Sequence, residues 1–532
     1  MSLGRKEYNM RKNKILVILL LLISSLFILT SCDSKKDDVV KVIDIELTEE
    51  EYAYVVKKGN TSLVNDFNIF LDEIIENGTL EEIVVKYFKN GQGKIGVPYT
   101  DSSDISNDEK TFVVATNCPF APFEYIDTDG LVYGIDIEVA KLYADSKGLD
   151  LVIKNLKFEA IFTSVDAGFA DIGMAGITVD SDRLASYDFT NAYYKASQKL
   201  VVATDNHIFD DCETVEDVET ILNGLENKTL GYQNGTVGSM YVVGEEEWGF
   251  PGFENLKHKG YDSAQMAIQD IANGNIFGVI LDEAPATTMV NAINSLVEWE
   301  VKVEVFKDSL SSDYFQKLIV QGLVNTLIIA VCGLLIGIVI GTLIAIVKVT
   351  PKYKRIVRIF DKVCTVYIAI FRGTPIVVQL LLTYYVLLPI MGITGVPSLV
   401  VAVIVFGLNS GAYVAEIMRG GINSIDKGQL EAGRALGLGY WTTMIKIVIP
   451  QAIKNIIPTL GNEFISLIKE TSVVSFIAVA DLYKAFNDIG TNNYEVIIPY
   501  CAMALIYVIL IIVISLLVKL IEKGLARSDR SN

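Results

Sequence analysis

Two charged residues in the first half of the chain could bind the charged groups of a small molecule. Arg183, the last residue of "AGITVDSDR", can hold both oxygens of a carboxylate, because its planar guanidinium donates hydrogen bonds in pairs. Asp282 follows the apolar run "GVIL" and could either pair with a cation or cap a helix that starts before Pro285. A cation and an anion of this kind are what the binding of a zwitterion requires.

The elements that position these residues alternate between strands and helices. From Thr111, short apolar runs such as "TFVVAT" and "LDLVIKN" are separated by amphipathic segments such as "GIDIEVAKLYADSKG" and "FEAIFTSVDAG". Strand and helix alternation predicts an α/β domain with parallel sheets.

The second half of the chain has the composition of a membrane domain. Apolar residues make up 51% of the 532 residues, and the net charge of -19 comes from residues 1–310, since residues 311–532 are net basic. This charge distribution argues against nucleic-acid binding, which needs a basic face. Apolar runs that approach or exceed the ~20 residues needed to cross a bilayer lie at 318–347, 358–391, 397–418, 455–480 and 496–520. They predict an all-α domain of five transmembrane helices over residues 315–525.

A small-residue stripe runs along the first of these segments. Gly333, Gly337 and Gly341 recur every four residues, so they share one helix face and allow a second helix to approach closely. We expect this face to serve packing.

The membrane half resembles the permeases of ABC importers. Its loop at 431–450 reads "EAGRALGLGYWTTMIKIVIP" and resembles their EAA loop; "FRGTPIVVQL", "GAYVAEIMRGGINSIDKGQ" and "KETSVVSFIAVADL" resemble the polar amino-acid branch. The resemblance implies a cytoplasmic helix-turn-helix that docks on a separate ATPase subunit. The positions that match the motif are Glu431, Ala432, Gly433, Gly437 and Pro450. The chain has no G-x-x-x-x-G-K-[ST] loop of its own, so ATP binding would belong to that partner.

The soluble half resembles two-lobed periplasmic-type amino-acid-binding proteins. The segments that carry the resemblance are "PFAPFEYIDTDGLVYGIDIEVAKLYA", "AGITVDSDRLASYDFTNAYY", "LGYQNGTVGS" and "GVILDEAPA". The resemblance assigns Arg183 to the ligand carboxylate and Asp282 to its ammonium, over a binding domain at 111–308. The remaining positions it implies are the aromatic rings of Phe120 and Phe158, and Gly176, Thr178, Gly235 and Thr236, whose polar groups would contact the ligand.

Two positions depart from the family pattern. Asn117 stands where relatives often have Asp, and Cys118 stands where they have small or polar residues. The loss of an acidic group disfavours a cationic ligand side chain, so glutamine or another neutral polar amino acid is preferred.

Residues 42–88 resemble the closing segment of this binding-protein family, although they stand at the start of the chain. The closing segment of the family is missing between Asp282 and the first apolar span. Both "VKVIDI" at 40 and "VKVEVF" at 301 resemble the strand that leads into that segment. A circular permutation explains both facts: residues 42–88 would complete lobe one, and residues 89–110 would link the old termini. The alternative is a remnant of a second, deleted binding domain.

The N-terminal segment has the plan of an export signal. Residues 1–31 combine basic residues with the apolar run "ILVILLLLISSLFILT", and "LTSC" ends at Cys32, which resembles a bacterial lipobox. We expect a lipoprotein-type signal peptide, lipidation of Cys32 and a tether at 32–41; the alternative is an uncleaved anchor helix.

These features together predict an amino-acid ABC importer subunit in which receptor and permease are one polypeptide. We expect a multi-pass protein of the bacterial cell membrane with an extracytoplasmic binding domain, no enzymatic activity, no cofactor and no metal. Its expected partners are an ABC ATPase, a second permease chain, identical or not, a free amino acid and membrane lipid. An amino-acid-gated ion channel or a chemosensory receptor are the alternatives; a channel would interrupt the binding domain with its spans, and a chemosensor would need a cytoplasmic signalling domain.

Overall fold

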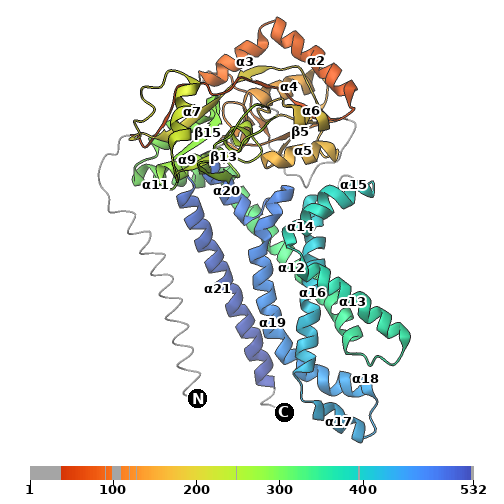
Figure 1. The fold of residues 1–532 in the computed structure, drawn as a ribbon. Coiled ribbons are helices and arrows are strands. Elements are labelled where there is room, and N and C mark those ends of the chain that lie inside the picture. The colour runs from red at the N-terminus through yellow and green to blue at the C-terminus, as the bar shows by residue number, and fades with distance from the viewer. Residues whose placement is uncertain are drawn as a thin grey trace.

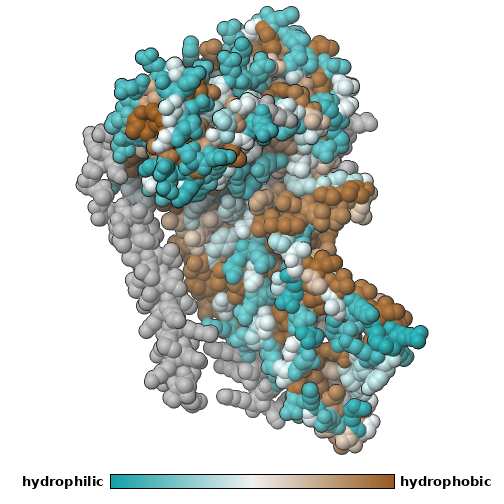
Figure 2. All heavy atoms as spheres, in the orientation of Figure 1, coloured by the Kyte–Doolittle hydropathy of each residue, from teal (hydrophilic) through white to brown (hydrophobic). Residues whose placement is uncertain are grey.

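The computed structural model describes residues 38–89, 92–98, 110–118, 120–127, 129–246, 248–393 and 396–528. A two-lobed α/β domain lies above a bundle of long helices (Figure 1). Figure 2 shows hydrophilic residues over most of the α/β domain, with hydrophobic residues gathered over the helices below it.

Lobe one is built on a five-stranded sheet of order β10-β3-β9-β5-β8. β5 runs parallel to β8 and β9, whereas β3 is antiparallel to both β9 and β10. The sheet strands are β3 (Val55–Lys57), β5 (Thr111–Thr116), β8 (Asp150–Asn155), β9 (Ile172–Gly173) and β10 (Tyr187–Phe189). Its helices are α2 (Thr61–Glu76), α3 (Thr79–Phe88), α4 (Ile135–Lys147), α5 (Phe158–Asp166) and α6 (Ser181–Ser186), and a small sheet adds β4 (Val97–Pro98), β6 (Tyr125–Ile126) and β7 (Leu131–Tyr133).

Lobe two has a second five-stranded sheet of order β1-β12-β15-β13-β14. β13 is parallel to β14 and β15, while β12 is antiparallel to β1 and β15. The strands are β1 (Val40–Val42), β12 (Gln198–Ala203), β13 (Thr229–Gln233), β14 (Lys257–Tyr261) and β15 (Gly278–Asp282). The helices are α7 (Val215–Gly224), α8 (Val237–Val243), α9 (Ala264–Ala272) and α10 (Glu283–Ser295). Both sheets therefore contain the parallel pairs that the alternating pattern predicts.

The early segment of the chain enters both lobes. β1 forms an edge of the lobe-two sheet, β2 (Glu50–Tyr52) pairs with β11 (Tyr194–Ala196) between the lobes, and β3 lies inside the lobe-one sheet. α2 begins after the Asn60 cap and buries Phe67 and Phe70 in the same hydrophobic cluster as Phe112 and Tyr143 of lobe one. These residues supply part of the lobe-one core, and the packing stabilises α2, since most helical stability in proteins comes from burial of an amphipathic face.

One strand-like run folds differently from its sequence. "VKVEVF" at 301–306 lies in α11 (Trp299–Ser311), although its β-branched residues favour a strand. Both sheets already have their strands, and α11 leads through Ser312 directly into α12. Tertiary context therefore overrides the local propensity.

The helical domain contains fewer clear membrane spans than the five predicted. Within the described residues, three helices are long and apolar enough to cross a membrane, or up to four if a bent pair counts as one span. The three long helices are α12 (Asp313–Val349), α16 (Ser398–Asn423) and α21 (Ile497–Ser528). The first member of the bent pair is α13 (Arg355–Gly373), and the second is the helical run 376–390, which contains α14 (Ile376–Leu381), η2 (Leu382–Leu387) and α15 (Leu388–Ile390). The two members are bent by 107°. Pro375 stands at that bend, where its ring disfavours a continuous helix.

The segment expected as a span at 455–480 divides into two elements. α19 (Ile449–Glu470) contains Pro458 and ends in Lys469 and Glu470, and the short 3-10 helix η4 (Thr471–Ile477) follows. α20 (Leu482–Asn492) then lies between the α/β domain and the long helices (Figure 1). α19 continues through Pro458, and the division falls directly after the charged residues Lys469 and Glu470.

The glycine stripe packs as its spacing predicts. A Cβ at Gly337 would lie 2.6 Å from Ser410 Oγ, and one at Gly341 would lie 2.7 Å from Ala415 N. Both neighbours belong to α16, so α12 and α16 approach closely along this face.

Candidate functional site

A closed cavity between the two lobes gathers most of the residues expected to bind a ligand. Its volume is about 10 Å³, which is room for about one water molecule. A larger ligand can enter only if the lobes move apart. Seven of the eight expected residues line it: Phe120, Phe158, Gly176, Thr178, Arg183, Thr236 and Asp282.

Arg183 links the two lobes through its guanidinium. Nη1 donates to the carbonyl of Thr178 at 2.6 Å in lobe one, and Nη2 donates to the carbonyl of Gly235 at 2.7 Å in lobe two. Nε pairs with Asp180 at 2.8 Å, and Asp180 also accepts from the Arg183 N–H as the cap of α6. The side chain is thus fixed in place, and a ligand carboxylate would take over donors that now bind backbone carbonyls.

Asp282 faces the cavity instead of capping the next helix. It precedes α10 but makes no side-chain capping hydrogen bond, and its carboxylate accepts a short hydrogen bond from the hydroxyl of Tyr52. Burial, and then the charge of Glu50, raises the pKa of Asp282 to about 7. A ligand ammonium would favour the ionised form of this carboxylate.

Gly176, Thr178 and Thr236 line the cavity, whereas Gly235 does not and instead accepts a hydrogen bond from Arg183 through its carbonyl. Gly176 has φ +53, and a Cβ there would lie 2.6 Å from the Phe120 ring, so only glycine fits. Its N–H donates to Asp136 and is not available to a ligand. Thr178 donates its hydroxyl to Glu50 at 2.7 Å. Thr236 precedes α8, and its hydroxyl donates to the carbonyl of Gln233.

Sequence reasoning missed several residues of this site. Tyr52 and Glu50 come from β2 in the early segment, and Gln233 lines the cavity beside Asn117, which the sequence had already singled out. No local signal marks the first two, because their role depends on the contact of β2 with β11 far along the chain.

Glu124 is the most unusual of the missed residues. It lines the cavity, is fully buried, and has no hydrogen-bond partner for either carboxylate oxygen among the described residues. Burial, followed by the charges of Asp136 and Asp282, raises the pKa of Glu124 well above its usual range. In its protonated form this side chain has one donor and one acceptor to offer.

The EAA-like loop forms a helical hairpin at the opposite end of the molecule (Figure 1). Glu431, Ala432 and Gly433 lie on α17 (Lys427–Ala435), and Gly437 follows it with φ +80. α18 (Tyr440–Thr443) returns, and the helix continues through η3 (Met444–Val448) into α19, with Pro450 in its first turn. Pro450 therefore does not end the hairpin, because the chain stays helical on both sides of it.

The hairpin is anchored on one side and exposed on the other. Tyr440 donates its hydroxyl to the carbonyl of Val349 at 2.7 Å, and Gly433 is buried where a Cβ would lie 2.4 Å from Thr443. Leu436 is 80% exposed and Trp441 is 44% exposed. This face of the hairpin therefore leaves apolar side chains uncovered.

The expected signal peptide, lipidation site and most of the tether lie outside the described residues. The signal segment 1–31, Cys32 and most of the tether 32–41 precede Asp38, where the description begins. Within the described ranges, no group of His, Cys, Asp or Glu could hold a metal ion.

The α/β domain has a two-lobed cavity, and it is joined to apolar helices and to an exposed hairpin. This combination is that of a membrane transport protein with its own solute receptor. Comparison with known proteins agrees: residues 112–419 match the bacterial extracellular solute-binding proteins, family 3, and residues 333–527 match the binding-protein-dependent transport system inner membrane component. The chain belongs to both families. It is an ABC importer permease fused to an extracytoplasmic solute-binding domain.

The permease half is similar to amino-acid transport proteins. It is 37% identical over 211 residues to the arginine transport system permease protein ArtQ of Bacillus subtilis, covering 40% of this chain and 94% of that protein. It is 37% identical over 206 residues to the glutamine transport system permease protein GlnP of Escherichia coli, covering 39% and 92%. A crystal structure of an amino acid ABC transporter with histidines is 39% identical, with a TM-score of 0.37 over 40% of this chain and 97% of that one.

Proposed function

We propose that this chain imports a polar, uncharged amino acid, with L-glutamine as the first candidate. The observation that carries the proposal is the closed cavity, in which Arg183 and Asp282 stand ready for a carboxylate and an ammonium. The importer relatives named for glutamine and for arginine support a polar amino acid as the solute.

The side chain of the ligand is selected by Glu124. A protonated carboxyl offers one donor and one acceptor, which is the complement of a carboxamide. Asn117 adds a carboxamide to the same cavity. An acidic residue at this position would favour a cationic ligand side chain. These groups favour glutamine over arginine.

Energy comes from a separate ATPase subunit that docks on the α17–α18 hairpin. The exposed Leu436 and Trp441 provide the apolar contacts of that surface, and the chain itself is not an enzyme. A second permease chain, identical or different, completes the translocation path. The surface of this chain that contacts the second permease chain includes α13. This helix has no buried residue and exposes Ile356, Ile359, Phe360, Val363, Val366 and Ile370.

The binding domain is circularly permuted. In support, β3 of the early segment lies between β9 and β10 of lobe one, and α2 contributes Phe67 to the core of that lobe. After α10 the chain leaves through α11 into the membrane helix α12, so the segment expected at that point has moved to the front.

Calorimetric titration of the purified full-length chain against the twenty amino acids tests the ligand. We expect L-glutamine to bind tightest, and Glu124→Ala to weaken glutamine binding more than alanine binding. Tightest binding of arginine or lysine would reject the amide assignment while leaving an amino-acid receptor. No binding of any amino acid would reject the function.

Two full-length variants test the permutation. Phe67 is fully buried and Ile69 is 70% exposed on the same helix. Phe67→Ala should lower the thermal midpoint of the binding domain and weaken ligand binding, because truncation of a buried Phe costs about 3–5 kcal/mol, whereas Ile69→Ala should change neither. Equal behaviour of the two variants would identify the segment as a remnant.

A further inference from the structure

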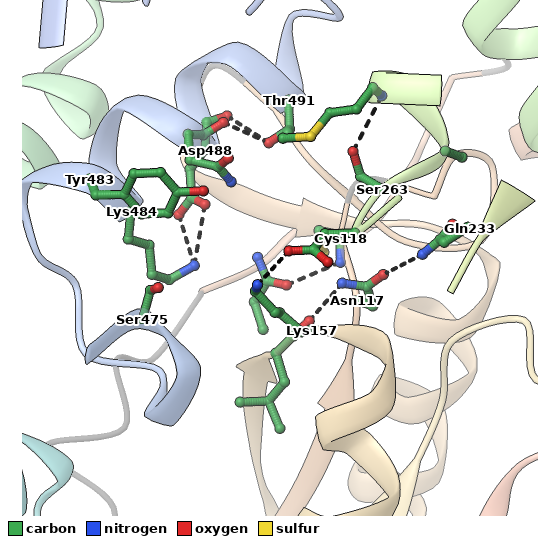
Figure 3. Close-up of a pocket in the computed structure, with 16 residues that line it drawn as sticks. Asn117, Cys118, Lys157, Gln233, Ser263, Ser475, Tyr483, Lys484, Asp488 and Thr491 are labelled. Atoms are coloured by element: carbon green, nitrogen blue, oxygen red, sulfur yellow. Dashed lines mark hydrogen bonds and ion pairs between the residues drawn. The ribbon is translucent and has the colours of Figure 1, made fainter. Parts of the chain in front are cut away.

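A second cavity lies where the binding domain meets the helical domain. Its volume is about 90 Å³, which is room for several water molecules and far more than the cavity between the lobes. Figure 3 shows its walls: Asn117 and Lys157 from lobe one, Gln233 from lobe two, and Lys484 and Asp488 from α20. We call it the junction cavity.

The junction cavity adjoins the ligand cavity. Asn117 and Gln233 line both of them, and Gln233 Nε2 donates to Asn117 Oδ1 over 3.5 Å, at the limit of a hydrogen bond (Figure 3). Asn117 follows β5 in lobe one, and Gln233 ends β13 in lobe two. Separation of the lobes therefore pulls apart the two side chains that divide the cavities.

The permease wall of the junction cavity carries a buried ion pair. Lys484 Nζ lies 3.0 Å from Asp488 Oδ2 and 3.2 Å from Oδ1, one turn apart on α20. The two side chains are only 10% and 7% exposed. A buried ion pair gives little net stability, because desolvation offsets the attraction, so stability alone is a weak reason for these charges to face a cavity.

The facing wall carries a second ion pair, which is more exposed. Lys157 of lobe one pairs with Asp262 of lobe two at 2.6 Å, and both line the same cavity. The cavity thus holds two cations and two anions in close pairs. A zwitterion presents the same two charges, so its carboxylate can pair with Lys484 and its ammonium with Asp488 without leaving either buried charge alone.

Contacts from both lobes hold the junction cavity in place. The ammonium of Lys157 in lobe one lies 3.8 Å from the ring centroid of Phe476 in η4. Gln265 of lobe two donates to the carbonyl of Gly490 in α20 at 3.2 Å. Since each lobe contacts a different element of the helical domain, movement between the lobes changes the shape of this cavity.

We propose that the junction cavity is a transfer site for a zwitterionic amino acid, which passes from the cleft to Lys484 and Asp488 before it enters the membrane helices. Lys484 receives the carboxylate and Asp488 the ammonium, as each releases the other. The inference rests on the proposed function, since it requires an amino acid in the cleft.

The test uses the full chain with its ATPase subunit in proteoliposomes, with labelled L-glutamine as the probe, or the tightest-binding amino acid from the titration. The double variant Lys484→Met/Asp488→Leu removes both charges and keeps the volumes similar. We expect the Kd for the probe to stay within about twofold, while uptake at saturating probe falls at least tenfold, as follows if two charge-assisted hydrogen bonds are lost. Lys141→Met/Asp145→Leu is the matched control, because that pair has the same spacing on the exposed face of α4, and it should retain full uptake.

A reversed pair separates transfer from a structural role. Lys484→Asp/Asp488→Lys keeps an ion pair on α20 but inverts its polarity towards the cleft; a structural role predicts wild-type uptake, and a transfer site predicts reduced uptake. Wild-type uptake by the neutral double variant, or a parallel loss of probe binding, would overturn the inference. A wild-type chain that neither binds nor imports an amino acid would instead refute the proposed function.

Discussion

The ligand cavity and the α17–α18 hairpin are the two functional regions at opposite ends of the molecule, and they are built in opposite ways. The cavity draws Tyr52, Arg183 and Asp282 from a stretch of the sequence in which the first and the last are 230 residues apart and buries them. The hairpin uses one contiguous stretch and leaves its apolar residues exposed. Binding of a charged solute needs desolvated groups held in fixed positions, whereas coupling to a partner needs an accessible surface.

The largest expected effect is on the cavity. Arg183→Ala removes two charge-assisted hydrogen bonds to the ligand carboxylate, each worth about 1.5–3 kcal/mol, so the Kd should rise by roughly a hundredfold or more. Arg434→Ala removes a similar charge from the hairpin and should leave the Kd unchanged. Calorimetry on both purified variants measures this; a matching loss in the two would mean that the regions are not independent.

The second effect is on the hairpin alone. Gly433→Ala places a methyl group 2.4 Å from Thr443 Cγ2, which forces α17 away from α18. Uptake and stimulated ATP hydrolysis should fall by about tenfold, since overpacking costs about 1–3 kcal/mol, with no change in Kd. Gly439→Ala is the control, because no atom lies within 4 Å of its Cβ position; an equal loss there would exclude the packing explanation.

The third prediction concerns pH and the cavity. In the unfolded chain an Asp titrates near pH 3.9, while burial raises the pKa of Asp282 and of Asp136 to about 7. Between these values the folded protein binds more protons than the unfolded chain, so its stability should fall as pH rises from about 4 to about 7.

Ligand affinity should follow the opposite trend. An ammonium pairs with ionised Asp282, so the Kd should be about tenfold larger at pH 6 than at pH 8. Titrations at the two values measure this, and Asp282→Asn should bind weakly with little dependence on pH. A flat Kd in the wild type would exclude Asp282 as the ammonium partner.

The smallest effect again belongs to the hairpin. Gly437 has φ +80 and open space around it, so Gly437→Ala introduces backbone strain of about 1 kcal/mol without a clash. Uptake should fall by only a few fold, and much less than for Gly433→Ala. The opposite order would show that turn conformation, not helix packing, controls coupling.

The same contrast explains what the sequence could predict. The hairpin is contiguous, so its glycines and its position are readable from the sequence. In the cavity, residues in recognisable segments such as Arg183 and Asp282 were predicted, whereas Tyr52, Glu50 and Glu124 depend on β2 meeting β11 and on burial. The bend of 107° after Gly373 and the division of 455–480 after Glu470 were missed because length and hydropathy do not record the local effect of Pro375 or of the charges of Lys469 and Glu470.

The direct passage from α11 through Ser312 into α12 has a kinetic consequence. A free receptor must diffuse to its permease and bind it tightly enough to dock at the concentration of the free protein. Here the receptor is held next to the membrane helices by a single residue. Its effective concentration at the permease is on the order of millimolar or higher, so weak contacts such as those of Lys157 and Gln265 are sufficient for docking. The receptor can therefore release and re-engage its permease within each cycle without being lost from the cell surface.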